Sequence, residues 1–509
     1  MPAPLGSLKD QTIDVLVLGG GLLGTSTARA LAARGARVAL VEPIDFGWGA
    51  SGRTSRLALE EPAAKVLLRP GRFRALLRER ATLVHAARPA ALPVPVVVPR
   101  ALVGAGEARS SARRERLASW LAPGGWPGPR AAAGKAAGKI PLAALEEGKA
   151  RLHFDALIDD RRLVLLTALA AAKAGVVLAQ RCDLTGLEVA DGGGVWAEIR
   201  DRVTGEAVNV RARAVVNATG AWIDHVRASF DVGREKLFPL ARAVRVAIDD
   251  PSDAAALLGR RDGAPFLLAP ATRGTLLAAP FEPAAQGSRE RAAERLLRLA
   301  ADYFGARPEP RAAFEELRPA VERAAMAREA ARGAPFWSVA AAGVLRERLT
   351  ARRLAERIED ELGRFAGRGA RAPLAASAAG ASLKRERQEA RGAGLGADQA
   401  RWMVGRYGAA WREVVTEAGG AEPLADGAPP LRCEVAWAVR EEGARTLSDI
   451  LLRWRLPEIA PSLEIEEIVA AAAADDATRA FAWSPVQRER ELERWRHERR
   501  LAYGPAEIG

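Results

Sequence analysis

A run of apolar positions followed by closely spaced glycines is the clearest pattern near the start of the chain. Residues 13–18 are apolar except for one aspartate, which predicts a buried parallel strand, and they lead directly into GGGLLG at 19–24. An alanine-rich stretch then predicts a helix, and residues 37–41 predict a second strand that ends on Glu42. Strand, helix and strand in this order predict a βαβ unit in an α/β fold.

Each glycine of this unit, and the acid that follows it, has a mechanical role in binding a dinucleotide. Gly19 permits the tight turn out of the strand, Gly21 lets a diphosphate approach the backbone, and Gly24 lets the helix pack closely on the strand. Amide groups at the helix start and the helix dipole would favour the negative phosphates. Glu42 would accept hydrogen bonds from the hydroxyls of the adenosine ribose. The alternative is a βαβ unit that keeps its shape without a ligand.

Further along the chain, the pattern predicts a hairpin and a second sheet. Residues 163–175 have the spacing of a helix, and residues 195–201 and 206–220 predict two strands of a hairpin. This hairpin would return the chain to the nucleotide-binding unit. Strand-like stretches between 235 and 285 predict the sheet of a second domain.

The last part of the chain carries helical patterns. Residues 368–394 are rich in alanine, glycine and arginine and predict a linker or a long loop. Beyond them, apolar residues such as Met403, Tyr407 and Trp411 recur at helical spacing, which predicts a separate C-terminal helical domain. Residues 470–509 predict a terminal helix.

The net charge of the chain limits the classes of binding partner but does not identify one. The formal charge of +13 would attract phosphorylated metabolites, acidic lipid head groups or nucleic acid. The basic residues are mostly arginines interleaved with acids, which is typical of solvated helix faces and of no nucleic-acid-binding motif. We therefore expect no nucleic-acid partner. No pattern in the sequence indicates an oligomeric state.

Cysteine usage and hydropathy indicate a reducing, cytoplasmic setting. Cys182 and Cys433 are far apart in sequence, so we expect neither a disulfide framework nor a metal site. The first residues lack the basic start and apolar run of a secretory signal. No stretch approaches the roughly 18 uninterrupted apolar residues of a spanning helix, so we expect no transmembrane segment.

A second motif indicates which dinucleotide is bound. VVNATGAW at 215–222 resembles the strand and turn with the sequence ATG that two-domain flavoproteins carry. An NAD-dependent enzyme would not need this segment. The resemblance implies FAD as the cofactor, with Ala218, Thr219 and Gly220 among the residues that bind it.

Taken together, motifs between residue 11 and about residue 455 resemble those of the FAD-dependent glycerol-3-phosphate dehydrogenase family, within the D-amino-acid oxidase-like flavoproteins. The motifs are DVLVLGGGLLG, ASGRTSRL, FDALIDDRRLV, VTGEAVNVRARAVVNATGAWID, FEELRP and EVAWAVREEGARTLSDILLRWR. The resemblance implies a Rossmann-like FAD-binding domain, a mixed-sheet substrate domain and a C-terminal helical domain. It implies an oxidoreductase region at 11–375, with FAD-binding parts at about 11–90, 150–230 and 310–365, substrate-domain parts at about 91–149 and 231–309, and the helical domain at 396–509.

The same resemblance implies roles for individual residues. Ser51, Arg53, Thr54 and Ser55 would lie near the diphosphate and ring of FAD, and Arg318 of the ELRP motif would bind the substrate. An arginine suits a phosphate monoester, because its planar fork donates two parallel hydrogen bonds.

Four segments depart from the family's pattern. Glu60 and Glu61 occupy the place of an HGGLRY-type segment, where they would oppose an anionic reduced flavin and an anionic substrate. Residues 239–245 lack the lysine and histidine of a KG-x-H-type segment. The GTTDTDY and GGKLTTYR segments are replaced at 277–282 and 340–346. The catalytic residues are therefore left unassigned.

Among the histidines, His225 is the candidate for a replacement base because it follows the ATG motif, although a lone histidine after a strand is more often structural.

Three hypotheses of function remain open. The first is an enzyme at the inner face of the cell membrane that oxidises glycerol 3-phosphate to dihydroxyacetone phosphate and passes electrons to quinone, as the resemblance implies. The second is an FAD-dependent enzyme with a changed substrate. The third is a binding or regulatory protein without turnover.

Overall fold

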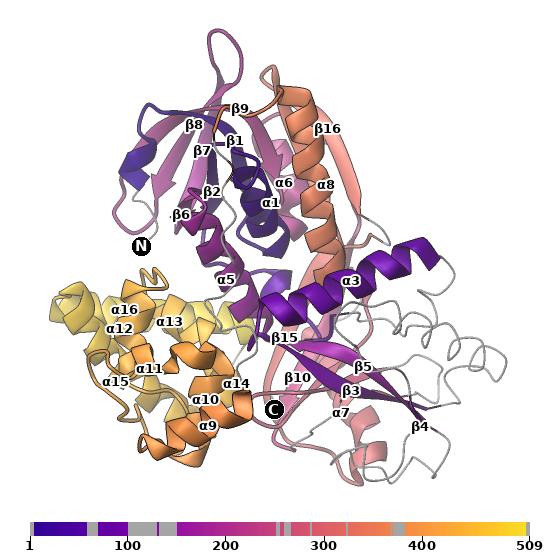
Figure 1. The fold of residues 1–509 in the computed structure, drawn as a ribbon, viewed down its shortest axis with the longest axis vertical. Coiled ribbons are helices and arrows are strands. Elements are labelled where there is room, and N and C mark those ends of the chain that lie inside the picture. The colour runs from indigo at the N-terminus through magenta and orange to yellow at the C-terminus, as the bar shows by residue number, and fades with distance from the viewer. Residues whose placement is uncertain are drawn as a thin grey trace. The chain divides into compact units, whose positions relative to one another are not determined.

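The computed structural model describes residues 5–58, 70–99, 130–131, 150–250, 255–258, 266–285, 288–321, 324–367, 369 and 382–504. The chain divides into two compact units. The first comprises residues 1–54, 160–241 and 317–375, and the second comprises residues 55–159, 242–316 and 376–509. Each unit is built around a sheet, and Figure 1 labels several strands of each.

A largely parallel sheet forms the centre of the first unit. Its parallel strands follow the order β17-β9-β1-β2-β6. They are β1 (Thr12–Leu18), β2 (Val38–Glu42), β6 (Val177–Gln180), β9 (Ala207–Asn217) and β17 (Ala334–Ala340). Helix α1 (Leu22–Ala32) connects β1 to β2, which confirms the predicted βαβ unit.

Antiparallel strands and helices complete this unit. Strands β7 (Cys182–Val189) and β8 (Val195–Asp201) pair with each other, and β8 pairs with β9, which confirms the predicted hairpin. Strand β16 (Ala325–Ala331) pairs with β17. Helix α1 packs against α5 (Asp160–Lys173) and α8 (Val344–Leu362). The apolar residues of β1, and those of β9 from Val208 onward, are almost fully buried, so the parallel strands lie at the core.

The second unit contains the second sheet that the sequence predicts between residues 235 and 285. Strands β10 (Leu240–Ile248), β13 (Thr275–Ala278) and β12 (Phe266–Pro270) pair antiparallel in that order. The sheet continues through β11 (Ala255–Leu258), β3 (Ala91–Pro99), β5 (Ala150–Ile158) and β4 (Arg130–Ala131), with β14 (Glu282–Pro283) and β15 (Pro310–Pro319) beside β10. Helix α7 (Arg289–Phe304) buries Leu296 and Leu297 against this sheet. Helix α3 (Pro70–Ala86) contacts β3 and β5.

Helices form the C-terminal part of the second unit, as predicted. They are α9 (Leu383–Gly392), α10 (Ala397–Tyr407), α11 (Trp411–Val414), α12 (Cys433–Arg440), α13 (Leu447–Arg453), α14 (Leu456–Ile459), α15 (Leu463–Phe481) and α16 (Pro485–Tyr503). Within the described residues, none of the helices is long and apolar enough to cross a membrane.

Two of the predictions for this part are wrong. The second half of the predicted linker at 368–394 forms α9, because the Ser382 side chain accepts a hydrogen bond from the backbone N–H of Arg385 and caps the helix. Residues 368 and 370–381 lie outside the described residues. The single terminal helix predicted over 470–509 is two helices, because Ser484 starts a new capping box and Pro485 occupies the first turn of α16.

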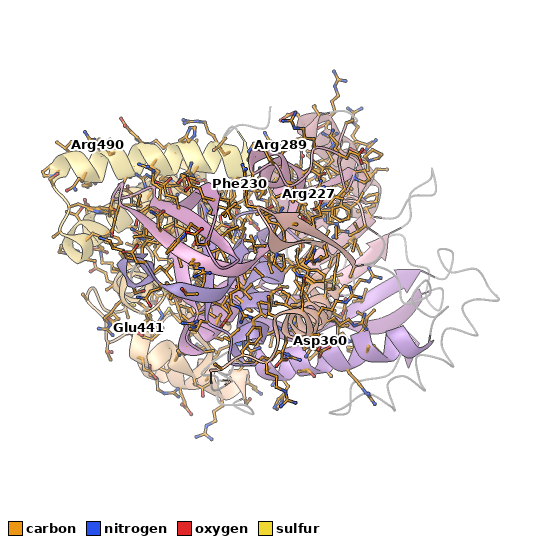
Figure 2. All side chains as sticks on the ribbon, turned by 90° about the horizontal axis from the view of Figure 1, so that it is seen from above. Arg227, Phe230, Arg289, Asp360, Glu441 and Arg490 are labelled. Atoms are coloured by element: carbon orange, nitrogen blue, oxygen red, sulfur yellow. The ribbon has the colours of Figure 1, made fainter. Side chains whose placement is uncertain are left out.

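The arginines of this basic chain fall into buried pairs and exposed groups. Arg227 is 3% exposed, and its Nε lies 2.8 Å from Glu329 Oε2 while its Nη1 lies 3.0 Å from Asp224 Oδ1. Arg490 lies at the outer surface on α16, and Figure 2 labels both residues. The prediction that the arginines lie on solvated helix faces therefore holds for some arginines, such as Arg490, and not for buried ones such as Arg227.

A buried carboxylate joins the C-terminal helices to the segment that precedes α3. Glu458 is 2% exposed and accepts hydrogen bonds from Arg56, from Arg455 and from the Tyr503 hydroxyl, the last two at 2.8 Å. Burial by itself would raise the pKa of Glu458, but the charges of Arg56 and Arg455 lower it to about 2. Removal of this carboxylate would take from Arg56 and Arg455 the buried counter-charge that they share, and would leave Asp159, 3.8 Å from Arg455 Nε, as a more distant one.

We expect Glu458→Gln to destabilise the protein by about 3 kcal/mol at neutral pH, because breaking one side of a buried ion pair strands the other. The folded-state pKa is depressed, so this stabilisation is present above pH 4.5 and is lost as the pH falls towards 2. Urea unfolding of both proteins at several pH values measures the difference. Glu489→Gln, at an exposed carboxylate, is the matched control. A difference that does not shrink below pH 4.5 would contradict this account.

Candidate functional site

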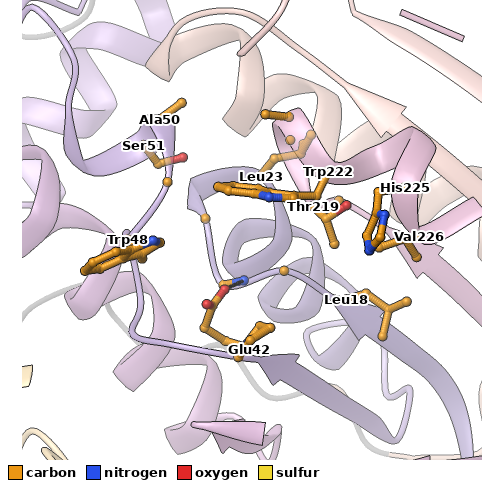
Figure 3. A pocket seen from close by; sticks show the side chains of 18 of the residues that line it. Leu18, Leu23, Glu42, Trp48, Ala50, Ser51, Thr219, Trp222, His225 and Val226 are labelled. Atoms are coloured by element: carbon orange, nitrogen blue, oxygen red, sulfur yellow. Dashed lines mark hydrogen bonds between the residues drawn. The ribbon is translucent and has the colours of Figure 1, made fainter. Parts of the chain in front are cut away.

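A cavity of about 410 Å³ opens in the first unit at the carboxyl ends of its parallel strands. Its lining includes the last residue of β1, the last residue of β2, the turn after β9 and the end of β17. In open α/β sheets, ligands bind at this edge, and the volume lies within the range of small-molecule pockets. Figure 3 shows the cavity and the side chains around it.

The turn between β1 and α1 has no room for side chains. Gly19 has φ +100°, and a Cβ on it would lie 2.7 Å from the carbonyl oxygen of Ala218. A Cβ on Gly24 would lie 1.9 Å from the carbonyl oxygen of Gly19. The roles predicted for these glycines, a tight turn and close helix packing, match this geometry. The turn therefore brings the N-terminus of α1 to the floor of the cavity.

A serine from a distant segment lies at that helix terminus. The Ser51 Oγ accepts a hydrogen bond from the Leu22 N–H at 3.0 Å, and a Cβ on Gly21 would lie 3.0 Å from the same oxygen. The hydroxyl keeps its own proton to donate. Helix N-terminus, glycine backbone and hydroxyl together form a cradle for a phosphate group.

Glu42 closes the cavity beside the turn. Its Oε2 accepts from the Gly20 N–H at 2.7 Å, and its Oε1 accepts from the Ile44 N–H at 2.9 Å. Burial raises the pKa of Glu42 to about 7, although these two hydrogen bonds act in the opposite direction. The carboxylate is therefore fixed in orientation beside the phosphate cradle, which suits it to accept hydrogen bonds from a ribose.

Two further predicted groups line the same cavity. Ala218, Thr219 and Gly220 form the turn after β9, and the Asn217 side chain holds this turn by accepting from the Thr219 hydroxyl at 2.7 Å. Arg318 reaches the cavity from the end of β15 and is half-buried.

Four predicted site residues do not line the cavity. Gly24 lies behind the turn, and Arg53 stacks on the Trp48 ring with its Cζ 5.2 Å from the ring centroid. The N–H and hydroxyl of Thr54 both donate to Asp160 Oδ2, at 2.8 and 2.9 Å. Ser55 is buried and belongs to the second unit. Their predicted contacts with a cofactor therefore stay predictions.

The cavity also contains residues that sequence reasoning did not assign to it. Trp48 and Trp222 contribute indole rings, and Val226 and Phe230 contribute apolar side chains from α6 (Ile223–Ser229) and its end. His225, which the sequence offers as a replacement base, lies among them. The position of Trp222 directly after the ATG motif was the available signal for this group.

The altered segments lie partly at the cavity and partly in the second unit. Ala340 and Ala341 of the altered segment 340–346 line the cavity. Glu60 and Glu61 lie outside the described residues. In the second unit, Arg242 Nη2 lies 3.1 Å from Glu282 Oε1, and Arg245 Nη2 lies 2.5 Å from Glu316 Oε2. The two arginines of the altered segment 239–245 are thus already paired with carboxylates.

Comparison with known families gives two matches that follow each other along the chain. Residues 14–357 match the family model described as FAD dependent oxidoreductase. Residues 369–488 match the model described as C-terminal domain of alpha-glycerophosphate oxidase. The first match covers more than half of the chain.

Among curated relatives, the chain is 27% identical over 259 residues to the aerobic glycerol-3-phosphate dehydrogenase of Staphylococcus saprophyticus, covering 48% of this chain and 44% of that protein. It is 31% identical over 227 residues to the D-erythritol 1-phosphate dehydrogenase of Brucella abortus, covering 42% of this chain and 43% of that protein. The chain therefore spans less than half the length of these relatives.

A solved structure supports the fold over nearly the whole chain. The structure of the glycerol-3-phosphate dehydrogenase from Bacillus halodurans complexed with FAD superposes with a TM-score of 0.74 at 21% identity, covering 98% of this chain and 96% of that chain. At this identity the likeness concerns the fold alone.

We expect Gly24→Ala to reduce dinucleotide binding by about ten-fold or more, because the new Cβ would force the turn away from β1. The flavin absorbance per mole of purified protein measures this effect. Gly392→Ala is the matched control, since a Cβ there meets no atom within 4 Å. Equal flavin content in the two variants would contradict the role of the turn.

We expect dinucleotide affinity to fall several-fold as the pH decreases from 8 to 6. Glu42 has a pKa of about 7, and its ionised form accepts ribose hydroxyls better than its protonated form does. Equilibrium titration with FAD at each pH measures the effect, and Glu42→Gln should flatten it. An unchanged pH dependence in the variant would assign the effect to another group.

Proposed function

We propose, from the premise that the chain belongs to the FAD-dependent oxidoreductase family, that it oxidises glycerol 3-phosphate to dihydroxyacetone phosphate. Family membership confirms the resemblance recognised in the sequence and FAD as the cofactor. We place the electron acceptor, a quinone, in the same proposal. Because quinones reside in the bilayer, the reaction would take place at the inner face of the cell membrane, where the net charge of +13 favours anionic head groups.

The described residues fit the ADP half of FAD. The turn at Gly19–Gly21 and the Ser51 hydroxyl would hold the diphosphate, and Glu42 would hold the ribose. FAD, when bound, supplies the acceptor for a hydride equivalent. The task of the protein is to bind and orient both partners.

The proposed substrate depends on Arg318, which would bind its phosphate group. It lines the same cavity as the phosphate cradle, so one unit contains both the cofactor site and a cation suited to a phosphate monoester. The relatives' names support this substrate class, since they refer to phosphates of two small polyols, glycerol and erythritol. Glycerol 3-phosphate is the member of this class that we propose first.

One observation favours the alternative of a changed substrate or of a binding protein without turnover. Arg242 and Arg245 are held by Glu282 and Glu316, so the second unit offers paired charges where the family's KG-x-H-type segment would stand. A phosphate approaching these arginines would have to compete with carboxylates already in place.

The deciding experiment is an absorbance spectrum of the purified protein followed by anaerobic addition of glycerol 3-phosphate. We expect flavin bands that bleach with substrate. Arg318→Ala should lower kcat/KM by about 100-fold while the flavin content stays unchanged, because a charged partner of the phosphate is lost. Arg490→Ala, at an exposed arginine on α16, should leave both values unchanged.

The other outcomes separate the alternatives. Flavin bands that bleach with dithionite but not with glycerol 3-phosphate would overturn the proposed substrate and leave a changed substrate or a binding role. The same test with D-erythritol 1-phosphate would then distinguish these two. A protein that takes up no flavin at all would contradict the assignment of the cavity to FAD.

A further inference from the structure

We infer that Arg56 and Glu458 are positioning residues for the cofactor. They fix the end of the segment that carries Ser51, so that the C-terminal helices influence how tightly the dinucleotide is held. The inference rests on the proposed assignment of the cavity to FAD. Neither Arg56 nor Glu458 lines the cavity, so each would act through the backbone between residues 51 and 56.

Ser51 depends on this backbone because its hydrogen-bond partner lies in a different part of the chain. Its Oγ accepts from the Leu22 N–H at 3.0 Å, and Figure 3 shows the serine beside the cavity on the segment that follows Trp48. The middle of the segment is closely packed, since a Cβ on Gly52 would lie 2.1 Å from the carbonyl oxygen of Gly47. The geometry of the phosphate cradle therefore depends on how this segment is fixed beyond Ser51.

In the first unit, a buried carboxylate fixes the segment at Thr54. The N–H and hydroxyl of Thr54 both donate to Asp160 Oδ2, at 2.8 and 2.9 Å. Asp160 is 1% exposed, and its Oδ1 accepts from the Arg161 N–H at 2.8 Å at the start of α5. The segment is thus tied to the first turn of a helix, and the chain passes into the second unit directly after Thr54.

In the second unit, the next residues run beside the end of β5. The Ile158 N–H donates to the Arg56 carbonyl at 2.8 Å, and the Ala58 N–H donates to the Ala156 carbonyl at 3.0 Å. Arg56 itself has φ +63°, a left-handed conformation that an arginine adopts only at an energetic cost. Such a conformation persists where the surrounding contacts enforce it.

The Arg56 side chain makes a contact of this kind. It is 5% exposed and donates to Glu458 Oε2. Glu458 is held in turn by Arg455 Nη1 and by the Tyr503 hydroxyl, which both donate to its Oε1 at 2.8 Å. Glu458, Arg455 and Tyr503 all belong to the C-terminal helical part, so the conformation at Arg56 depends on that part of the chain.

Fixing the chain at both Thr54 and Arg56 has a consequence for binding. A segment that is ordered before the ligand arrives does not have to be ordered by the ligand, and this strengthens binding. Without the contact between Arg56 and Glu458, the cost of ordering would fall on the binding step. Ser51 would then contribute less to the affinity, because it would no longer be held at the start of α1.

A double-mutant cycle between Arg56 and Ser51 tests this coupling in the 509-residue chain, with FAD and ADP titrated into the flavin-free protein. Ser51→Ala should weaken both ligands about ten-fold in the wild-type background. Arg56→Gly suits a left-handed backbone but removes the contact with Glu458, and should weaken both ligands about five-fold. In the Arg56→Gly background, Ser51→Ala should cost only about two-fold, because the two effects are coupled.

Arg332→Gly is the matched control. Arg332 is also an arginine at positive φ, +50°, but it lies in the turn between β16 and β17, at the opposite end of β17 from the cavity. This variant should leave both affinities unchanged. Additive effects of Ser51→Ala and Arg56→Gly, or unchanged affinity in Arg56→Gly, would overturn the inference alone. A wild-type protein that binds neither FAD nor ADP would overturn the cofactor assignment as well.

Hydrogen exchange in Glu458→Gln tests the same coupling if Arg56→Gly does not fold. The amide of Leu22 donates to Ser51, so its exchange in the flavin-free protein reports on the position of the serine. We expect this exchange to become several-fold faster in Glu458→Gln, while the amide of Val17 in the buried strand β1 stays slow. An equal increase at both amides would show a general loss of stability and contradict a positioning role.

Discussion

The close approach of α1 to β1 is the constraint on which the rest of the first unit depends. Gly24 lies against the carbonyl of Gly19, and Gly19 lies against the backbone of Ala218, so three backbone segments meet without intervening side chains. This contact brings the start of the helix and the turn after β9 to one edge of the sheet. Ser51 and Glu42 are then fixed by hydrogen bonds to amides of the same turn, so the groups proposed to bind the phosphates and the ribose share one support.

Local signals were enough to predict most of the fold and the floor of the site. The glycine spacing, the apolar strands and the acid at the end of β2 all lie within one stretch of about thirty residues, and their geometry is dictated by backbone contacts. The two errors among the helices have a common cause. At Ser382 and at Ser484–Pro485 a single capping side chain starts each helix, and the composition of the surrounding segment does not reveal that start.

The parts that could not be predicted depend on contacts between distant segments. The Ser51 hydroxyl accepts a hydrogen bond from the N–H of Leu22 at the start of α1, 29 positions earlier in the chain. No local sequence pattern predicts this hydrogen bond. The family resemblance predicts that residues of the segment 51–55 lie near FAD, but it does not tell which side chains face the cavity. Of the four predicted residues, Ser51 lines the cavity and the other three do not. Thr54 turns to Asp160 instead, because a buried carboxylate needs donors and the threonine supplies two of them. Side-chain direction in such a turn is therefore a property of the packed unit.

Carboxylates neutralise part of the chain's positive charge within the described part of the second sheet. Arg242 and Arg245 are matched with Glu282 and Glu316, and each pair lowers the field that an incoming phosphate would experience. The same pairing of arginine with carboxylate stabilises the Glu458 cluster in the C-terminal helices. Arg318, whose strand ends at the cavity, is the residue that we propose for binding a phosphorylated substrate. A single guanidinium clamps a phosphate less selectively than several cations do, so under this proposal the substrate specificity would depend on cavity shape more than on charge.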